Sequence, residues 1–223
     1  MIPWELLDSS NVVGEAEKLT LSRRGDEYSI KTGYSELMNS RMHGSEDALA
    51  ELGCKHIKNK SKARILIGGL GMGFTLAETL KHVGDDAEVI VAELVPAVIQ
   101  WNKTYLSALA GHPLQDKRVR VHQGDVGNLI RAEKGGFDAI LLDVDNGPEG
   151  LTRKENDALY SLAGLKAGLA GLRDGGVYGV WSTFPDAHFT KRMQQAGFKV
   201  EEVRARAHGK RGSKHMIWLG ERR

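Results

Sequence analysis

The segment Arg64-Ile65-Leu66-Ile67-Gly68-Gly69-Leu70-Gly71-Met72-Gly73-Phe74-Thr75 joins a short apolar run to a cluster of glycines. The branched residues at 65–67 are typical of a strand that is buried on both faces of a sheet. Beyond the glycines, apolar residues recur at helical spacing from Phe74 to Val83. The segment therefore predicts a strand, a turn and a helix.

A carboxylate follows the glycine cluster on the next predicted strand. Glu93 ends a second apolar run, residues 87–92, and lies 20 residues beyond Gly73. Glycines allow a ligand to approach the backbone closely, and a carboxylate at this strand tip can accept hydrogen bonds from both ribose hydroxyls. The glycines alone are also compatible with a plain tight turn, but the combination predicts a nucleoside site. The residues expected to contact the nucleoside are Gly68, Gly69, Gly71, Gly73 and Glu93.

Length and composition limit the organisation of the chain. With 223 residues and 41% hydrophobic content, it is long enough for one sizeable domain and a small appendage. The net charge of +2 gives no general argument for nucleic acid or a membrane surface, although the pI near 8.6 permits an acidic partner. The single cysteine, Cys54, cannot form an intrachain disulfide.

The N-terminus and the apolar runs indicate where the protein is expected. Residues 1–5 lack the basic and apolar regions of a signal peptide, and no run approaches the ~18 apolar residues that span a bilayer. We therefore expect a cytoplasmic protein with no membrane contact.

The region before the first core strand is expected to be small. Alternating apolar residues on both sides of the turn Arg24-Gly25-Asp26 predict a β-hairpin. Residues 45–52 then begin with a serine cap and acidic residues, and they predict the helix that leads into the core. This divides the chain into a hairpin region, 1–44, and a nucleoside-binding domain, 45–223. Because an isolated hairpin is barely stable, the protein could pair with a second subunit as a homodimer.

Strand and helix patterns alternate through the rest of the chain. Apolar runs predict strands, with helices between them, at 65–67, 87–92, 119–121, 137–142 and 177–181. Two last strands, 200–207 and 216–219, are joined by a polar segment that is too short for a crossover, so they must pair antiparallel. The predicted fold is a doubly wound α/β fold with a mostly parallel seven-stranded sheet and one antiparallel strand.

From about residue 60 onward, the sequence resembles the class I S-adenosylmethionine-dependent methyltransferases, a Rossmann-like fold whose sheet ends in such a reversed strand. Within that class it is similar to the spermidine synthase family, whose members transfer an aminopropyl group from decarboxylated S-adenosylmethionine to an amine. The matching pieces are Gly68-Gly69, Gly73, Glu93, Gly124-Asp125, Asp143 and Leu159-Tyr160-Ser161. The N-terminal hairpin also resembles a shortened form of the family's β-domain.

The resemblance implies roles for three further residues, and each has a structural alternative. Asp125 is implied as the acceptor for the adenine amino group, or it only caps the helix that begins at Val126. Asp143 lies at the carboxyl end of a central strand, where open sheets bind ligands, or it only orders the loop after it. Tyr160 directs its hydroxyl toward the substrate, or it fills the core.

The sequence departs from the family pattern at residues that carry the chemistry. The aspartate of the family's glycine loop corresponds to Gly71, and the family's base aspartate corresponds to Asn146, with Asp145 one residue early. Aminopropyl transfer needs a deprotonated amine and carboxylates that bind a cationic substrate. Methyl transfer depends more on alignment, since the sulfonium donor is itself reactive. We therefore expect methyl transfer to a small, amine-bearing acceptor, with aminopropyl transfer as the alternative.

The expected cosubstrate is S-adenosylmethionine or its decarboxylated form, and Asp143 is expected to contact it. The expected catalytic residues are Asp143, Asp145, Asn146 and Tyr160. The loop 143–150 is expected to be a mobile chemical centre. No bound metal is expected, although a magnesium-assisted O-methyltransferase that uses the oxygen ligands of this loop is a lesser alternative. His43 lies in a polar loop, where a surface histidine is favoured over a substrate contact.

A nucleic-acid-binding module on the same scaffold is the alternative from another class of function. Its support is the basic residues beyond position 203, namely Arg204, Arg206, Lys210, Arg211, Lys214, Arg222 and Arg223. Glu221 is the single acid there, and Trp218 is the single aromatic residue. Because a stacking platform is poorly supported, nucleic acid is not the expected partner.

Overall fold

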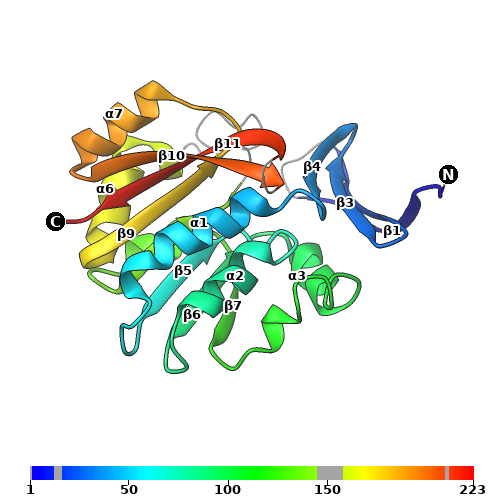
Figure 1. Cartoon of the computed structure of the whole chain (residues 1–223), viewed down its shortest axis with the longest axis horizontal. Coiled ribbons are helices and arrows are strands. Elements are labelled where there is room, and N and C mark those ends of the chain that lie inside the picture. Colours follow the sequence, from blue (N-terminus) through cyan, green and yellow to red (C-terminus); the bar gives the residue numbers. More distant parts are fainter. Residues whose placement is uncertain (1, 13–16, 145–157, 209–210) are drawn as a thin grey trace.

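The computed structural model describes residues 2–12, 17–144, 158–208 and 211–223. The strands of its large sheet are β5 (Arg64–Gly68), β6 (Glu88–Glu93), β7 (Val119–Gln123), β8 (Phe137–Leu142), β9 (Leu172–Ser182), β10 (Lys199–His208) and β11 (Arg211–Glu221). They lie in the order β10-β11-β9-β8-β5-β6-β7 (Figure 1). β11 runs antiparallel to both of its neighbours, whereas the other described pairs are parallel. The predicted seven-stranded, mostly parallel sheet is confirmed.

Helices cover both faces of the large sheet, as Figure 1 shows. They are α1 (Gly44–Cys54), α2 (Phe74–His82), α3 (Pro96–Lys103), α4 (Val126–Ala132), α6 (Leu162–Gly171) and α7 (Ala187–Ala196). Two short 3-10 helices, Lys55–Ile57 and Pro113–Gln115, lie in the connections. The first three α-helices share one apolar core with the sheet, and α4, α6 and α7 share the other.

Successive residues of β5 face opposite sides of the sheet, and both sides are buried. Ile65 and Ile67 belong to the core under α1, α2 and α3, whereas Leu66 belongs to the core under α4, α6 and α7. All three side chains are 0% exposed. Burial on both faces explains why the run is continuously apolar rather than alternating.

The N-terminal region is a four-stranded antiparallel sheet and is larger than the predicted hairpin. Its strands are, in order, β1 (Glu5–Ser10), β2 (Leu19–Arg24), β3 (Glu27–Thr32) and β4 (Ser35–Asn39). The hairpin of β2 and β3 is as predicted. The sequence does not predict the edge strands β1 and β4, because they are mostly exposed and lack a regular alternation of apolar and polar residues.

The small sheet packs against the helical layer of the same chain. Leu21 of β2 and Ile30 of β3 belong to the core under α1, α2 and α3. The indole nitrogen of Trp101 in α3 donates a hydrogen bond to Asp8 Oδ2 in β1 at 2.7 Å. The predicted regions 1–44 and 45–223 therefore share a core. This internal support removes the argument for a partner subunit, so the homodimer stays an untested prediction.

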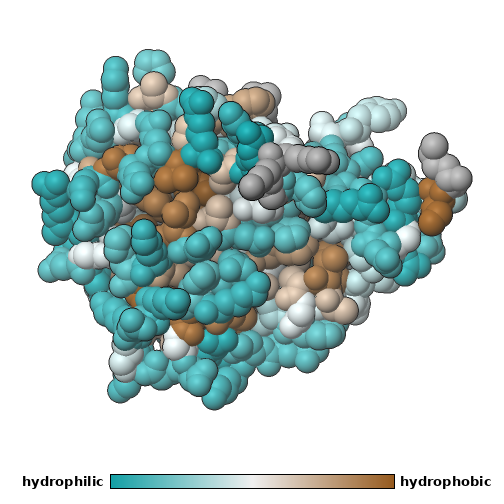
Figure 2. Space-filling view, viewed as in Figure 1, coloured by the Kyte–Doolittle hydropathy of each residue, from teal (hydrophilic) through white to brown (hydrophobic). Residues whose placement is uncertain are grey.

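Hydrophilic side chains cover most of the face that Figure 2 shows, and the apolar areas on it are small patches. Beneath this face, the side chains of the two cores are largely enclosed. Within the described ranges, no helix has the length and apolar character that crossing a bilayer requires.

The carboxyl ends of the central strands meet at the glycine turn. The amide of Gly69 donates to the Ala92 carbonyl at 2.9 Å, and the amide of Asp143 donates to the Gly68 carbonyl at 2.8 Å. Gly69 has a φ of +88°, and a Cβ atom there would lie 2.2 Å from the carbonyl oxygen of Asp143. Glycine is required for both the conformation and the close approach. The turn therefore fixes Asp143 beside the glycine loop.

We expect Gly69→Ala to lower the free energy of unfolding by at least about 2 kcal/mol, because the methyl group adds backbone strain and a clash with Asp143. Gly175→Ala is the matched control. Its φ is +75°, but no described atom lies within 4 Å of the added Cβ, so strain alone applies and costs about 1 kcal/mol. Urea denaturation of both variants measures the difference. Equal losses would contradict the importance of the close approach.

Candidate functional site

A cavity of about 370 Å³ lies between the carboxyl edge of the large sheet and the N-terminal sheet. The carboxyl edge is where open α/β sheets bind their ligands. The carboxyl ends of the parallel strands and the segments after them contribute Gly69, Gly71, Glu93, Asp125, Asp143, Trp181 and Thr183. The N-terminal sheet contributes Leu19, Ile30, Thr32, Glu36, Leu37, Met38 and Asn39. Glu46 from α1 and His215 from β11 also line the cavity.

The direction of α1 and β11 brings Glu46 and His215 to this edge. α1 leads into β5, so it begins at the carboxyl edge of the sheet. β11 is reversed relative to β9, so its first residues also lie at this edge. Neither residue is among the site residues that the sequence predicts. The rule that a helix leading into a parallel strand begins at the carboxyl edge could have identified Glu46.

Glu93 connects the glycine loop to the segment before α3. Its Oε2 accepts a hydrogen bond from the Leu70 amide at 2.9 Å, and its Oε1 accepts one from the Val95 amide at 2.7 Å. The residue is 8% exposed and lines the cavity. Each carboxylate oxygen has a second lone pair, so Glu93 can order the loop and still accept bonds from a ligand.

Asp125 is the N-cap of α4, as one of its two alternatives predicted. Its Oδ1 accepts a hydrogen bond from the Gly127 amide at 2.8 Å. Its Oδ2 lies 3.4 Å from the Arg131 guanidinium. The residue also lines the cavity. Capping therefore leaves room for a ligand contact, which stays a prediction.

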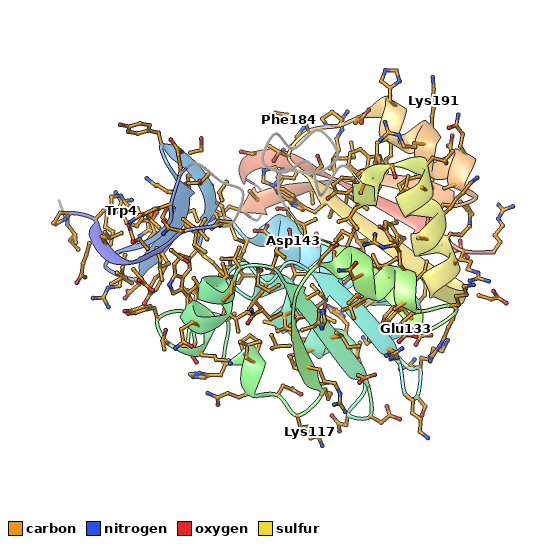
Figure 3. The ribbon with its side chains drawn as sticks, turned by 180° about the vertical axis from the view of Figure 1, so that it is seen from behind. Trp4, Lys117, Glu133, Asp143, Phe184 and Lys191 are labelled. Carbon is orange, nitrogen blue, oxygen red and sulfur yellow. The ribbon has the colours of Figure 1, made fainter. Side chains whose placement is uncertain are left out.

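Asp143 follows β8 and lies in the middle of the molecule, beside α1 (Figure 3). Its Oδ2 accepts a hydrogen bond from the Thr75 hydroxyl at 2.6 Å. Burial raises the pKa of Asp143, and the bond from Thr75 only partly opposes this change. The carboxylate thus lies in the cavity without a described cationic partner.

Glu46 is a further carboxylate in the same cavity, and unlike the half-buried Asp143 it is buried. It is 8% exposed, and its Oε2 accepts a hydrogen bond from the Ser45 hydroxyl at 2.7 Å. Burial, together with the negative charge of Asp143, raises the pKa of Glu46 to about 7. Two carboxylates that repel each other in an enclosed space favour a cation between them.

Ser45 links Glu46 to His215. The serine lies inside the first turn of α1 rather than at its cap, because the N-cap is His43. The Ser45 hydroxyl donates to Glu46, so it accepts from Nδ1 of His215, which lies 2.8 Å away. The His215 ring contacts Trp181 edge-on, with centroids 4.8 Å apart, and burial lowers the pKa of His215. The neutral ring with its proton on Nδ1 therefore orients the serine.

Several predicted site residues do not line the described cavity. Gly68 contributes its carbonyl to the strand contact, and Gly73 is the N-cap of α2. Tyr160 is 2% exposed in the core, where its hydroxyl donates to the Val144 carbonyl at 3.2 Å and its ring meets Phe189 edge-on. The geometry favours the core alternative for Tyr160 over direct contact with a substrate.

The remaining predictions concern the loop after β8, metal ligands and His43. Asp145, Asn146 and most of the loop 143–150 lie outside the described residues. Within the described ranges, no three or more His, Cys, Asp or Glu side chains are arranged as metal ligands. His43 stacks on Phe74, with ring centroids 4.1 Å apart, and is not among the residues that line the cavity.

We expect Glu46→Gln to remove part of the pH dependence of stability. Between the ordinary pKa of 4.5 and about 7, the folded state keeps a proton on Glu46 that the unfolded state has released. Stability therefore falls as the pH rises through this window, by about 3 kcal/mol in total. Glutamine carries no charge, so the variant should be more stable than the parent at pH 8.5 by about that amount and similar to it at pH 5.

Glu51→Gln is the matched control, because Glu51 lies on the exposed side of the same helix. It should leave the pH dependence unchanged. Urea denaturation between pH 5 and pH 8.5 measures all three proteins. A Glu46→Gln curve that runs parallel to that of the parent would show that Glu46 is ionised throughout.

The family model for the spermine/spermidine synthase domain matches residues 42–202. Among curated proteins, the chain is 30% identical over 115 residues to a polyamine aminopropyltransferase of Korarchaeum cryptofilum and 30% identical over 125 residues to one of Leptospira biflexa. The matches cover 51% and 55% of this chain, and 33% and 43% of those relatives. The matched part thus spans less than half of either relative.

Solved structures share the fold over almost the whole chain. Spermidine synthase from Thermotoga maritima gives a TM-score of 0.76 at 17% identity, with 98% of this chain and 73% of that one covered. A spermidine synthase in complex with the transition-state analogue AdoDATO gives 0.75 at 17% identity, with 98% and 72% covered. The common fold and the domain match over most of the sequence lead to one conclusion: the chain belongs to the spermine/spermidine synthase family.

Proposed function

We propose that the chain transfers an aminopropyl group from decarboxylated S-adenosylmethionine to a small amine. The charge of the cavity is the observation that carries this proposal. Its acidic lining residues are Glu36, Glu46, Glu93, Asp125 and Asp143. Among the described residues that line it, there is no lysine or arginine. Such a cavity attracts cations and repels carboxylates.

Both proposed substrates are cations. Decarboxylated S-adenosylmethionine carries a sulfonium and an ammonium group, and a diamine acceptor carries ammonium groups. S-adenosylmethionine itself keeps a carboxylate, which would lie among these acids without a described cation to pair with it. The lining therefore supports the decarboxylated donor.

The comparisons do not support methyl transfer, which the sequence analysis favoured. That preference rested on Gly71 and Asn146, which replace two acids of the family pattern. The curated relatives are named polyamine aminopropyltransferases, and one structure with the same fold is in complex with the analogue AdoDATO. We propose that Glu46 supplies negative charge that the glycine loop lacks, since it lines the same cavity as Gly71.

The proposed reaction is a displacement at the carbon next to the sulfonium. The acceptor nitrogen forms a bond to this carbon while the carbon–sulfur bond breaks, and the electron pair leaves with sulfur as a neutral thioether. In this proposal Glu93 binds the ribose, Asp125 accepts from adenine, and Asp143 binds an ammonium group. Gly69 and Gly71 allow the nucleoside to approach the backbone. The enclosed cavity holds the two substrates in line.

The direct test combines calorimetry with product analysis. We expect the purified chain to bind decarboxylated S-adenosylmethionine at least about tenfold more tightly than S-adenosylmethionine, because only the latter adds a repelled carboxylate. With putrescine as acceptor, mass spectrometry should detect spermidine and methylthioadenosine. Methylated putrescine formed from S-adenosylmethionine, with no spermidine from the decarboxylated donor, would reject the proposal.

We expect Glu93→Gln to weaken methylthioadenosine binding about tenfold or more, because a charge-assisted hydrogen bond to the ribose is lost. Glu88→Gln is the control, since Glu88 lies at the other end of β6 and pairs with Arg64 and Arg120. It should leave the affinity within about twofold. Calorimetry measures binding, and thermal unfolding checks the folding of each variant. Equal affinities in the two variants would place the ribose elsewhere.

A further inference from the structure

The turn end of β10 and β11 extends past the end of β9. β11 pairs with β9 from Met216 to Glu221, whereas its pairing with β10 continues to Arg211. Within the described residues, positions 211–215 therefore pair with β10 alone. We call residues 204–208 and 211–216 the C-terminal ribbon. Figure 1 shows this end of β10 and β11 beside the small sheet, and Nδ1 of His208 lies 3.0 Å from the carbonyl oxygen of Arg41, which follows β4.

The two faces of the C-terminal ribbon have different surroundings. Ala205 and His215 are cross-strand partners on the face that packs against α1, where His215 contacts the first turn of the helix. Arg206 and Lys214 form the next pair, so their side chains project from the opposite face. Arg204 precedes Arg206 by two residues and shares this face. All three cationic residues are exposed.

The exposed face carries charge of one sign. Arg206 and Lys214 lie directly opposite each other, and like charges in this position destabilise a β-pair. In the part of the chain that the structure describes, no carboxylate lies within ion-pair distance of either residue or of Arg204. Glu202, the next acid along this face of β10, instead accepts a hydrogen bond from the Thr190 hydroxyl of α7. The repulsion on this face thus has no internal compensation among the described residues.

The sequence of the C-terminal ribbon is basic throughout. Residues 204–214 include five lysines and arginines and no aspartate or glutamate. Charges on an edge strand also prevent unwanted pairing with other sheets. Mixed charges are sufficient for that purpose, and the first part of β10 has them in Lys199, Glu201 and Glu202. A run of one sign is better explained by an anionic partner.

We propose that the exposed face of the C-terminal ribbon binds the phosphate backbone of a nucleic acid without reading its sequence. Residues on one face of a strand repeat about every 6.6 Å, so Arg204 and Arg206 present a row of charges, with Lys214 beside it. A row of charges fits a polymer that carries one charge at every unit. A protein partner would need an aromatic or apolar anchor as well, and the exposed described residues of the ribbon include none.

Binding to phosphates does not require stacked bases. The sequence gives little support for a stacking platform, and the structure agrees, because Trp218 is 0% exposed in the core. Binding without sequence preference depends on cations that neutralise phosphates, and these contacts carry no sequence information. The inference goes beyond the proposed transfer reaction and does not depend on it.

Fluorescence anisotropy with a labelled 20-nucleotide oligouridine RNA tests the inference. Three neutralised phosphates predict that log Kd rises with log salt with a slope of about 2 or more. The Kd should therefore increase about 15-fold or more between 50 and 200 mM KCl. Oligoadenylate of the same length should bind within about threefold of oligouridine, because the ribbon contacts only the backbone.

The triple variant Arg204→Gln, Arg206→Gln, Lys214→Gln should bind the RNA at least about tenfold more weakly at 50 mM KCl. Its salt slope should be lower than that of the parent by about 2, because three phosphate contacts are lost. The substituted side chains are exposed, so thermal unfolding should show a folded protein. Spermidine formation by the variant should stay within about twofold of the level in the parent.

The matched control is Lys55→Gln, Lys58→Gln, Lys117→Gln, which changes the net charge by the same amount. These lysines are exposed and precede β5 or β7, so they lie at the amino edge of the large sheet, away from the C-terminal ribbon. The control should bind RNA within about twofold of the parent.

Three results would overturn the inference. A parent that does not bind the RNA at 50 mM KCl would reject it outright. Equal losses in the triple variant and the control would show that net charge alone attracts RNA. Polyglutamate that displaces the RNA at an equal concentration of charge would show that the C-terminal ribbon binds acidic polymers in general rather than nucleic acid.

Discussion

The backbone contact between Gly69 and Asp143 is the constraint on which the site depends. The missing Cβ of Gly69 lets the ends of β5 and β8 come together, and this contact fixes where the Asp143 carboxylate lies. Glu93 then ties the glycine loop to the tip of β6 through the Leu70 amide. The backbone thus fixes where these acidic residues lie. Because the backbone is closely packed, the carboxylates cannot easily move apart to reduce their repulsion.

The buried acids have an energetic consequence for the free protein. Glu46 is buried and Asp143 is half-buried in the same cavity, and the negative charge of Asp143 makes ionisation of Glu46 less favourable. A bound cationic ligand would offset this repulsion. Its binding should therefore also raise the free energy of unfolding of the protein. The same charges oppose anionic ligands. A site built in this way discriminates by charge before it discriminates by shape.

Much of the fold and part of the site could be predicted from the sequence, because these features are local. The strand before Gly68, the cap at Asp125 and the carboxylate at Glu93 each follow from short-range patterns. The edge strands β1 and β4 could not be predicted, since their exposed residues leave no periodic signal.

The part of the site that the sequence did not reveal depends on contacts between distant segments. Glu46 looks like an ordinary acid in the first turn of a helix, which is a common place for one. Its burial depends on the packing of α1 against α2, β9, β10 and β11, and none of these contacts can be inferred from the residues around it. The expectation of methyl transfer was drawn from Gly71 and Asn146 alone, so it overlooked negative charge that another element supplies.

The order of strands also has a consequence for how the protein is made. β10 precedes β11 in the chain but joins the sheet only through it, since the order at this edge is β10-β11-β9. During synthesis, β10 therefore has no strand to pair with until β11 has left the ribosome. Ser45 likewise gains its contact with His215 only after 170 further residues have been synthesised. The cavity is therefore completed only after β11 has been made, and a chain that stops before β11 would expose Glu46 to water without its neighbour His215.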